Sequence, residues 1–193
     1  MKMGETMAIS RDAVLLVVDV QCGFDQYNES LHRNTPELER NIARLLDAWR
    51  ATGRPVVFVQ HVSRLPQSPL RPNQPGVEIK SEVRPRSGEP VVQKSVNSAF
   101  IGTSLEADLR AAGRTTLVVT GMQTNLCVST TARMAGNLGF DTYVVSDATA
   151  TFDNTGPDGR LYPAQLLHDV ALADLHREFA TVVSTDSIME SLE

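Results

Sequence analysis

The sequence has only two cysteines, Cys22 and Cys127, among 193 residues. It therefore lacks the paired cysteines with which small secreted domains build a disulfide framework, and we expect reduced thiols and a cytoplasmic location. Positive charge is also scarce, because 18 Lys and Arg face 23 Asp and Glu, which gives a formal net charge of −5. Nucleic-acid binding relies on clustered Lys and Arg, so we expect no nucleic-acid partner.

Long apolar runs are missing as well. Residues 1–10 contain Lys2, Glu5 and Thr6 and fit neither a signal peptide nor a membrane span. We expect a loose leader over 1–10, a single domain over 11–193 and no membrane partner. The 41% hydrophobic content is ordinary for one globular domain, and a chain of this length buries a sufficient core without a metal or a disulfide.

Short apolar, β-branched runs alternate with helical patterns along the rest of the chain. This alternation predicts an α/β domain with a doubly wound sheet of about six parallel strands and helices on both faces. The expected strands cover 13–19, 55–60, 91–93, 115–120, 140–145 and 180–183. The expected helices cover 36–52, 103–112, 125–138 and 163–179.

The pattern disappears over residues 61–90, a segment rich in proline. A structureless stretch of this length is typical of a lid or binding loop, but it also fits a solvated excursion or an arm that contacts a neighbouring subunit. Four arginines lie in it, and they either favour an anionic ligand or are merely solvated: Arg64, Arg71, Arg84 and Arg86.

Three chemically active side chains follow predicted strands. Asp19 ends the first, Lys94 follows the third, and Cys127 comes soon after the fourth. Each alone fits a structural role, as a turn cap, a solvated lysine or a small core residue. Ligands bind beyond the carboxyl ends of such strands, and a base and a cation together would ionise a thiol there. If Thr124 caps the next helix, Cys127 lies in its first turn, where the helix dipole favours a thiolate.

Three segments carry a resemblance to a known family. VVDVQCGF, QKSVNSAF and the stretch that begins TGMQTNLCVS resemble the signature regions of the isochorismatase-like cysteine hydrolases, which include nicotinamidases and carbamoylsarcosine amidohydrolases. The resemblance extends over about 13–185. It implies a three-layer, Rossmann-like sheet and a cysteine hydrolase that cleaves a C–N bond of a small amide, ureide or lactam through a thioester.

The resemblance also implies the roles of individual residues. The catalytic triad is Asp19, Lys94 and Cys127. A cis peptide between Met122 and Gln123 is implied, with the N–H groups of Gln123 and Cys127 forming an oxyanion hole. Two other functions stay open: vinyl-ether hydrolysis of the isochorismatase type, and a non-catalytic module that binds a small molecule or a flavin. Cys127 favours the amidohydrolase, and neither a Gly-x-Gly-x-x-Gly nor a Walker loop is present.

One motif departs from the resemblance. Nicotinamidase-like members carry Asp-x-His…His after the second strand, whereas residues 60–67 read QHVSRLPQ. We therefore expect no metal and no cofactor. His61 either lines the pocket or hydrogen-bonds at the strand end, and His168 is expected to pack on its helix.

The remaining expectations concern partners. Five residues that follow strand ends are expected to contact a small-molecule substrate: Gln21, Phe24, His61, Asn97 and Phe100. The long loop and the resemblance predict a homo-oligomer, either a dimer or a tetramer.

Overall fold

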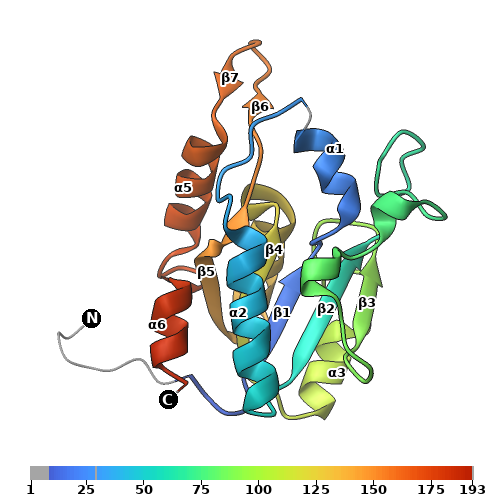
Figure 1. Ribbon diagram of the computed structural model, residues 1–193. Helices are drawn as coiled ribbons and strands as arrows, with labels where there is room; N and C mark the ends of the chain where they lie inside the picture. Colours follow the sequence, from blue (N-terminus) through green and yellow to red (C-terminus); the bar gives the residue numbers. More distant parts are fainter. Residues whose placement is uncertain (1–8, 29, 193) are drawn as a thin grey trace.

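A computed structural model describes residues 9–28 and 30–192, so most of the expected leader, 1–8, lies outside the described residues. Its centre is a parallel sheet with the order β3-β2-β1-β4-β5-β8, which confirms the expected α/β architecture (Figure 1). The strands are β1 (Val14–Val18), β2 (Val56–His61), β3 (Val91–Lys94), β4 (Thr116–Met122), β5 (Asp141–Ala150) and β8 (Thr181–Val183). The chain adds β2 and β3 on one side of β1 and then returns to add β4 on the other. This reversal marks the place where ligands bind in such sheets.

Helices cover both faces of the sheet. One face carries α2 (Leu38–Ala51) and α6 (Thr185–Glu190), and the other carries α3 (Leu105–Ala111), α4 (Ser129–Asn137) and α5 (Ala164–Leu175). All five residues of β1 are buried, which explains its unbroken apolar sequence. Trp49 of α2 is fully buried and donates its indole N–H to the carbonyl of Ala13 at 3.0 Å. No helix in the described part of the chain is long and apolar enough to cross a membrane.

Several short elements were not expected from the sequence. They are α1 (Asp25–Asn28), α6, and an antiparallel hairpin of β6 (Asn154–Thr155) and β7 (Leu161–Tyr162) that projects from the upper end in Figure 1. Strand β5 runs to Ala150, beyond the expected end at 145, because pairing with β4 resumes after an irregularity between Val119 and Gly121. Conversely, α5 ends at Leu175 and not at 179.

The proline-rich segment has two different halves. Residues 75–83 form two 3-10 turns, η2 (Pro75–Val77) and η3 (Ser81–Val83), and Ile79 pairs with Gln21 in an isolated bridge. Lys80 is buried and its ammonium contacts Asp25 at 2.5 Å and Glu39 at 2.9 Å. This half is packed structure and not a solvated excursion. Most side chains of residues 64–73, by contrast, are exposed.

Candidate active site

The carboxyl ends of the central strands bring Asp19, Lys94 and Cys127 into contact. The Lys94 Nζ lies 2.6 Å from Asp19 Oδ2 and 3.3 Å from Cys127 Sγ. The side chains of Lys94 and Asp19 are both fully shielded from solvent. Asp19 adopts a left-handed backbone conformation, with φ at 54°, immediately after β1. Strained backbone of this kind is frequent where a side chain is aimed for function.

His61 completes the surroundings of the ammonium. Its Nδ1 lies 3.1 Å from Lys94 Nζ, and the backbone of Val96 hydrogen-bonds the same ring. Burial and the positive charge of Lys94 lower the pKa of His61 to about 4, so the ring is neutral at pH 7. An ammonium can only donate, so Nδ1 accepts and the ring proton sits on Nε2. The three N–H bonds of Lys94 thus meet three acceptors: Asp19, His61 and Cys127.

The electrostatics of the thiol differ from the expectation. Burial, followed by the neighbouring Asp19 carboxylate, raises the pKa of Cys127 to about 12, and Lys94 offsets this only in part. Burial also raises the pKa of Asp19 to about 6, again against the pull of Lys94. The resting pair at pH 7 is therefore a carboxylate beside a protonated thiol and not the stable thiolate expected from the sequence.

One oxygen of Asp19 remains available for proton transfer. Oδ2 accepts from Lys94, whereas Oδ1 is buried without a hydrogen bond of normal geometry among the described residues. Besides Lys94, the Cys127 thiol and the backbone N–H of His61 are the donors that interact with this carboxyl group. A carboxylate with a pKa near 6 and an unoccupied oxygen is suited to act as a general base near neutral pH.

The local chain before Cys127 corrects the expected helix cap. Residues 124–128 form a π-helical turn, and the α-helix itself begins at Ser129, so Cys127 precedes it. The hydroxyl of Thr124 makes no cap; it lies 2.9 Å from Nδ1 of His168 on α5. Both side chains are buried, so their hydrogen bond fixes the turn that carries the cysteine. His168 is packed on its helix, as expected, and it also has this polar partner.

The peptide between Met122 and Gln123 is cis, as the resemblance implies. The carbonyl of Gln123 accepts from the N–H of Leu126 at 3.0 Å and from that of Val128 at 3.1 Å. The residues on either side of Cys127 are thus tied to one carbonyl, which orients the turn.

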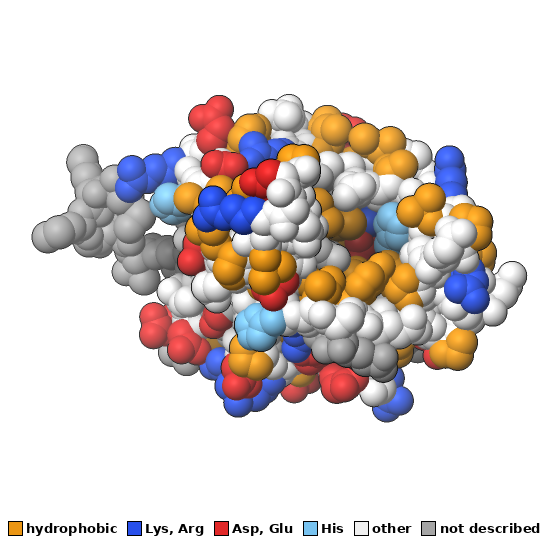
Figure 2. Space-filling view, turned by 90° about the horizontal axis from the view of Figure 1, so that it is seen from above, with side chains coloured by type: hydrophobic (Ala, Val, Ile, Leu, Met, Phe, Trp, Pro, Cys, Tyr) orange, Lys and Arg blue, Asp and Glu red, His pale blue; other side chains and the backbone are white. Residues whose placement is uncertain are grey.

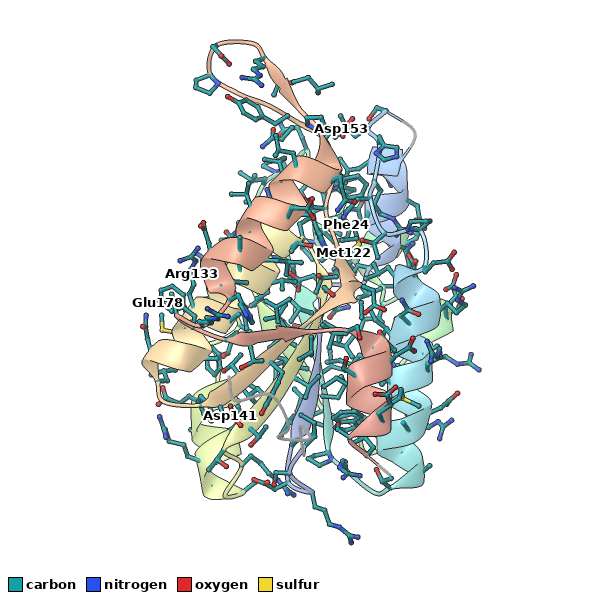
Figure 3. All side chains as sticks on the ribbon, turned by 90° about the vertical axis from the view of Figure 1, so that its left-hand side faces the viewer. Phe24, Met122, Arg133, Asp141, Asp153 and Glu178 are labelled. Carbon is teal, nitrogen blue, oxygen red and sulfur yellow. The ribbon has the colours of Figure 1, made fainter. Side chains whose placement is uncertain are left out.

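The expected substrate contacts divide into different roles. Gln21 is fully buried and its amide bonds the N–H and C=O of His61 and the carbonyl of Val77, so it supports the end of β2 and does not face a ligand. Phe24, labelled in Figure 3, is buried in the core. Its ring stacks on that of Phe152, with ring centroids 6.1 Å apart.

Two further expected contacts lie beyond β3. Phe100 is half-buried and stacks on Phe140 at 5.8 Å. Asn97 is exposed just beyond Lys94 in the chain. Of the five residues, only His61 hydrogen-bonds a member of the Asp19, Lys94 and Cys127 group, through Lys94, and only Asn97 is exposed.

The cluster also resembles a metal-ligand set. The side-chain ligand atoms of Asp19, His61 and Cys127 lie within 4.8 Å of one another, and all three residue types bind zinc. The ammonium of Lys94, however, lies within 3.3 Å of an atom of each. It already occupies the place where a cation would bind. Sequence reasoning missed the pairing of His61 with Lys94, although the two are register partners on β2 and β3.

Comparison with known proteins assigns the family. The family model for the isochorismatase domain matches residues 13–187. The chain belongs to the isochorismatase family. The isochorismatase-family protein YrdC of Bacillus subtilis is 46% identical over 175 residues, which cover 91% of this chain and 93% of YrdC. A hydrolase of the isochorismatase family from Chromobacterium violaceum has a solved structure that matches with a TM-score of 0.93 and 44% identity, over 98% of both chains.

Other isochorismatase-family relatives carry names of amide hydrolases. Nicotinamidase 3 of Arabidopsis thaliana is 30% identical, over 95% of this chain and 90% of its own. The ureidoacrylate amidohydrolase RutB of Variovorax paradoxus is 31% identical, over 72% of this chain and 68% of its own. The protein is thus an isochorismatase-family hydrolase whose relatives include amidohydrolases.

Proposed function

We propose that this hydrolase is a cysteine-dependent amidohydrolase that cleaves a C–N bond of a small amide, ureide or lactam. The observation that carries the proposal is the contact between a buried carboxylate, an ammonium and a thiol at the carboxyl ends of the strands. The names of the relatives nicotinamidase and ureidoacrylate amidohydrolase support it. Vinyl-ether hydrolysis would not require a nucleophilic thiol beside a general base.

The first half-reaction forms a thioester. Oδ1 of Asp19 takes the proton of Cys127 as the sulfur attacks the carbonyl carbon, so a stable thiolate is not required beforehand. The N–H groups of Gln123 and Cys127 hold the developing oxyanion. Protonated Asp19 then gives its proton to the nitrogen and the C–N bond breaks. Ammonia or an amine leaves from an amide or ureide, whereas a lactam ring opens and its new amine stays attached to the acyl group.

The second half-reaction releases the acid. Asp19 takes a proton from water, the resulting hydroxide attacks the thioester carbon, and the C–S bond breaks. The sulfur recovers its proton from Asp19, and the product leaves as a carboxylic acid, or as a carbamic acid from a ureide. The Lys94 side chain, in contact with both groups, stabilises the negative charge that moves between carboxylate and sulfur.

The decisive experiment is a panel of small amides, ureides and lactams assayed for release of ammonia or amine. Cys127→Ala is expected to abolish turnover of any substrate found, while circular dichroism and the melting temperature show a folded protein. Rapid acid quench followed by mass spectrometry is expected to show an acyl adduct on Cys127 of the wild type. Wild-type turnover by the Cys127→Ala variant, or preferential hydrolysis of a vinyl ether, would refute the proposal.

A further inference from the structure

A cavity of about 530 Å³ lies at the amino ends of the central strands, between the first residues of β1 and β2 and helix α3 (Figure 1). Its volume is in the range of small-molecule sites. The reactive cluster lies at the other, carboxyl ends of the strands, where Figure 2 shows hydrophobic side chains around a hollowed surface. The described residues that line the amino-end cavity include no member of the reactive cluster. It is therefore a separate site.

Much of the wall of the amino-end cavity is apolar. Side chains from three neighbouring strands and from α3 contribute to it: Val14, Val56, Val57, Val92, Leu105 and Leu109. All of these except Val92 are buried in the core of the protein. Burial of apolar surface drives association, so a wall of this composition favours a ligand with an apolar body.

Two arginines add positive charge to this apolar wall. Arg54 precedes β2, Arg114 precedes β4, and both residues are half-buried. Within residues 9–28 and 30–192, neither guanidinium has a hydrogen bond or an ion pair, and Nε of Arg54 is buried without an acceptor. Withdrawing a charge from water costs free energy unless the charge is paired. These two guanidinium groups are therefore stabilised when an anion binds them.

The acidic residues of the lining do not neutralise the arginines. Glu89 accepts hydrogen bonds from Arg50 through both carboxylate oxygens, each at 2.8 Å. Asp108 is exposed and accepts from the hydroxyl of Ser104 at 2.7 Å. Both carboxylates thus have partners of their own, and the unpaired charge at the cavity is positive.

The turns that carry the two arginines do not require a basic residue. After each of α2, α3 and α4, the chain passes through a glycine of left-handed conformation: Gly53, Gly113 and Gly139. The next N–H bonds to the carbonyl five residues earlier, at 2.9–3.0 Å in all three turns. The residue that follows the glycine is Arg54 or Arg114 in two of these turns but Phe140 in the third. The turn itself therefore does not explain the two arginines.

We propose that the amino-end cavity binds a small monocarboxylate with an aliphatic tail, the carboxylate on Arg54 and Arg114 and the tail on the valines and leucines of the wall. A guanidinium matches a carboxylate with two parallel hydrogen bonds, which fixes orientation as well as charge. A small hydrophilic anion would leave the apolar wall uncovered, and a neutral apolar molecule would leave the two charges unpaired. The inference is independent of the proposed function, because it involves none of the reactive residues.

The first test separates the two parts of the ligand. Calorimetry of the wild type is carried out with octanoate, with octanol, which has the tail without the charge, and with acetate, which has the charge without the tail. One octanoate is expected to bind per chain, about tenfold or more tightly than octanol and about 100-fold or more tightly than acetate. Absence of saturable octanoate binding, or equal affinity for octanoate and octanol, would overturn the inference.

The second test removes the two charges one at a time. Arg54→Gln and Arg114→Gln are each expected to weaken octanoate binding about tenfold or more, as for a lost hydrogen bond to a charged group. Arg64→Gln is the matched control, because Arg64 is exposed and lies outside this cavity, and the octanoate affinity is expected to stay unchanged. If the arginines serve the fold alone, their variants melt at lower temperature with an unchanged octanoate affinity, and that result refutes the proposal.

The third test locates the ligand. A photoreactive diazirine derivative of octanoate is irradiated with the wild type, and the labelled peptides are identified by mass spectrometry. Label is expected on residues 87–92 or 105–114, and excess octanoate is expected to suppress it. Label on residues 122–128 instead would place octanoate beside Cys127 and would contradict a separate site.

Discussion

The Nζ of Lys94 lies 3.1 Å from Nδ1 of His61, so the ammonium donates one of its three hydrogens to a neutral imidazole. The two residues are opposite each other where β2 and β3 pair, and Gln21 holds the backbone of His61 through its N–H and its C=O. The imidazole therefore supports the position of the ammonium, which in turn contacts the carboxylate and the thiol.

Replacing His61 is expected to lower activity through Lys94. His61→Leu removes the acceptor and leaves one ammonium hydrogen unbonded in a buried place, a loss of about 1–3 kcal/mol. We expect kcat to fall about tenfold or more, with a smaller change in KM. His61→Asn offers an amide oxygen near the position of Nδ1 and is expected to restore part of kcat. Steady-state kinetics of the two variants decides, and equal losses in both would argue against a role as hydrogen-bond acceptor.

The pH dependence of kcat/KM is expected to follow Asp19. Burial raises its pKa to about 6, and the base must be ionised to take the thiol proton. Activity is therefore expected to fall as pH drops through about 6, with a slope near one on a logarithmic plot, and to be level above pH 7. His61 has a lowered pKa of about 4 and does not contribute in this range. If activity instead falls only at or below pH 4, the general base is not an Asp19 carboxylate with a raised pKa.

Removal of metal is expected to leave activity unchanged, because the ammonium of Lys94 fills the space between the three potential ligands. Activity is measured after exhaustive treatment with EDTA and after addition of zinc, manganese or iron. Loss on chelation followed by recovery with one metal would contradict this prediction.

The same geometry makes a prediction for Lys94→Ala. Without the ammonium, Asp19, His61 and Cys127 are free to bind a divalent ion, and the variant is expected to take up Co²⁺ with a sulfur-to-cobalt absorption band. The wild type serves as the control and is expected to show no such band. Adding Cys127→Ser to the variant is expected to remove it, and a band that survives would place the ion elsewhere.

A homo-oligomer remains a proposal that sedimentation can test. Leu166 and Val170 lie one helical turn apart on α5 and are 45% and 52% exposed. Apolar side chains adjacent on a helix are typical of surfaces buried by association. Analytical ultracentrifugation is expected to give a species larger than 21.1 kDa at micromolar concentration, and Leu166→Glu with Val170→Glu to shift it toward that mass. A monomeric wild type would contradict the proposal.

The centre of the sheet was predictable because β1 and β4 are buried along their whole length and therefore appear in the sequence as apolar runs, as in 13–19. The grouping of Asp19, Lys94 and Cys127 followed from the position of each after a strand. The contacts of the residues expected to bind substrate were not predictable. Phe24 packs with Phe152, which is distant in the sequence, and the sequence alone does not show such partners.

The electrostatics of the site could not be predicted for a related reason. The sequence indicates that a cation lies near Cys127, but it does not show that the surroundings are buried. Burial and the Asp19 carboxylate outweigh Lys94 and raise the pKa of the thiol to about 12. The role of Thr124 likewise depends on a residue on α5. Its hydroxyl hydrogen-bonds His168 and therefore does not cap the following helix.

The two halves of the proline-rich segment differ in how well they are expected to tolerate substitution. Residues 75–83 are anchored by Lys80, whose ammonium binds Asp25 and Glu39, and by the bridge of Ile79 to Gln21. Residues 64–67 and 71–73 are exposed, whereas Pro69 and Leu70 between them are buried, with Leu70 in the main core cluster. Substitutions at the exposed positions of this stretch are expected to leave the packed residues in place. Laboratory evolution can therefore randomise the exposed positions 64–67 and 71–73 while the packed residues Pro69 and Leu70 and the cluster of Asp19, Lys94 and Cys127 remain untouched.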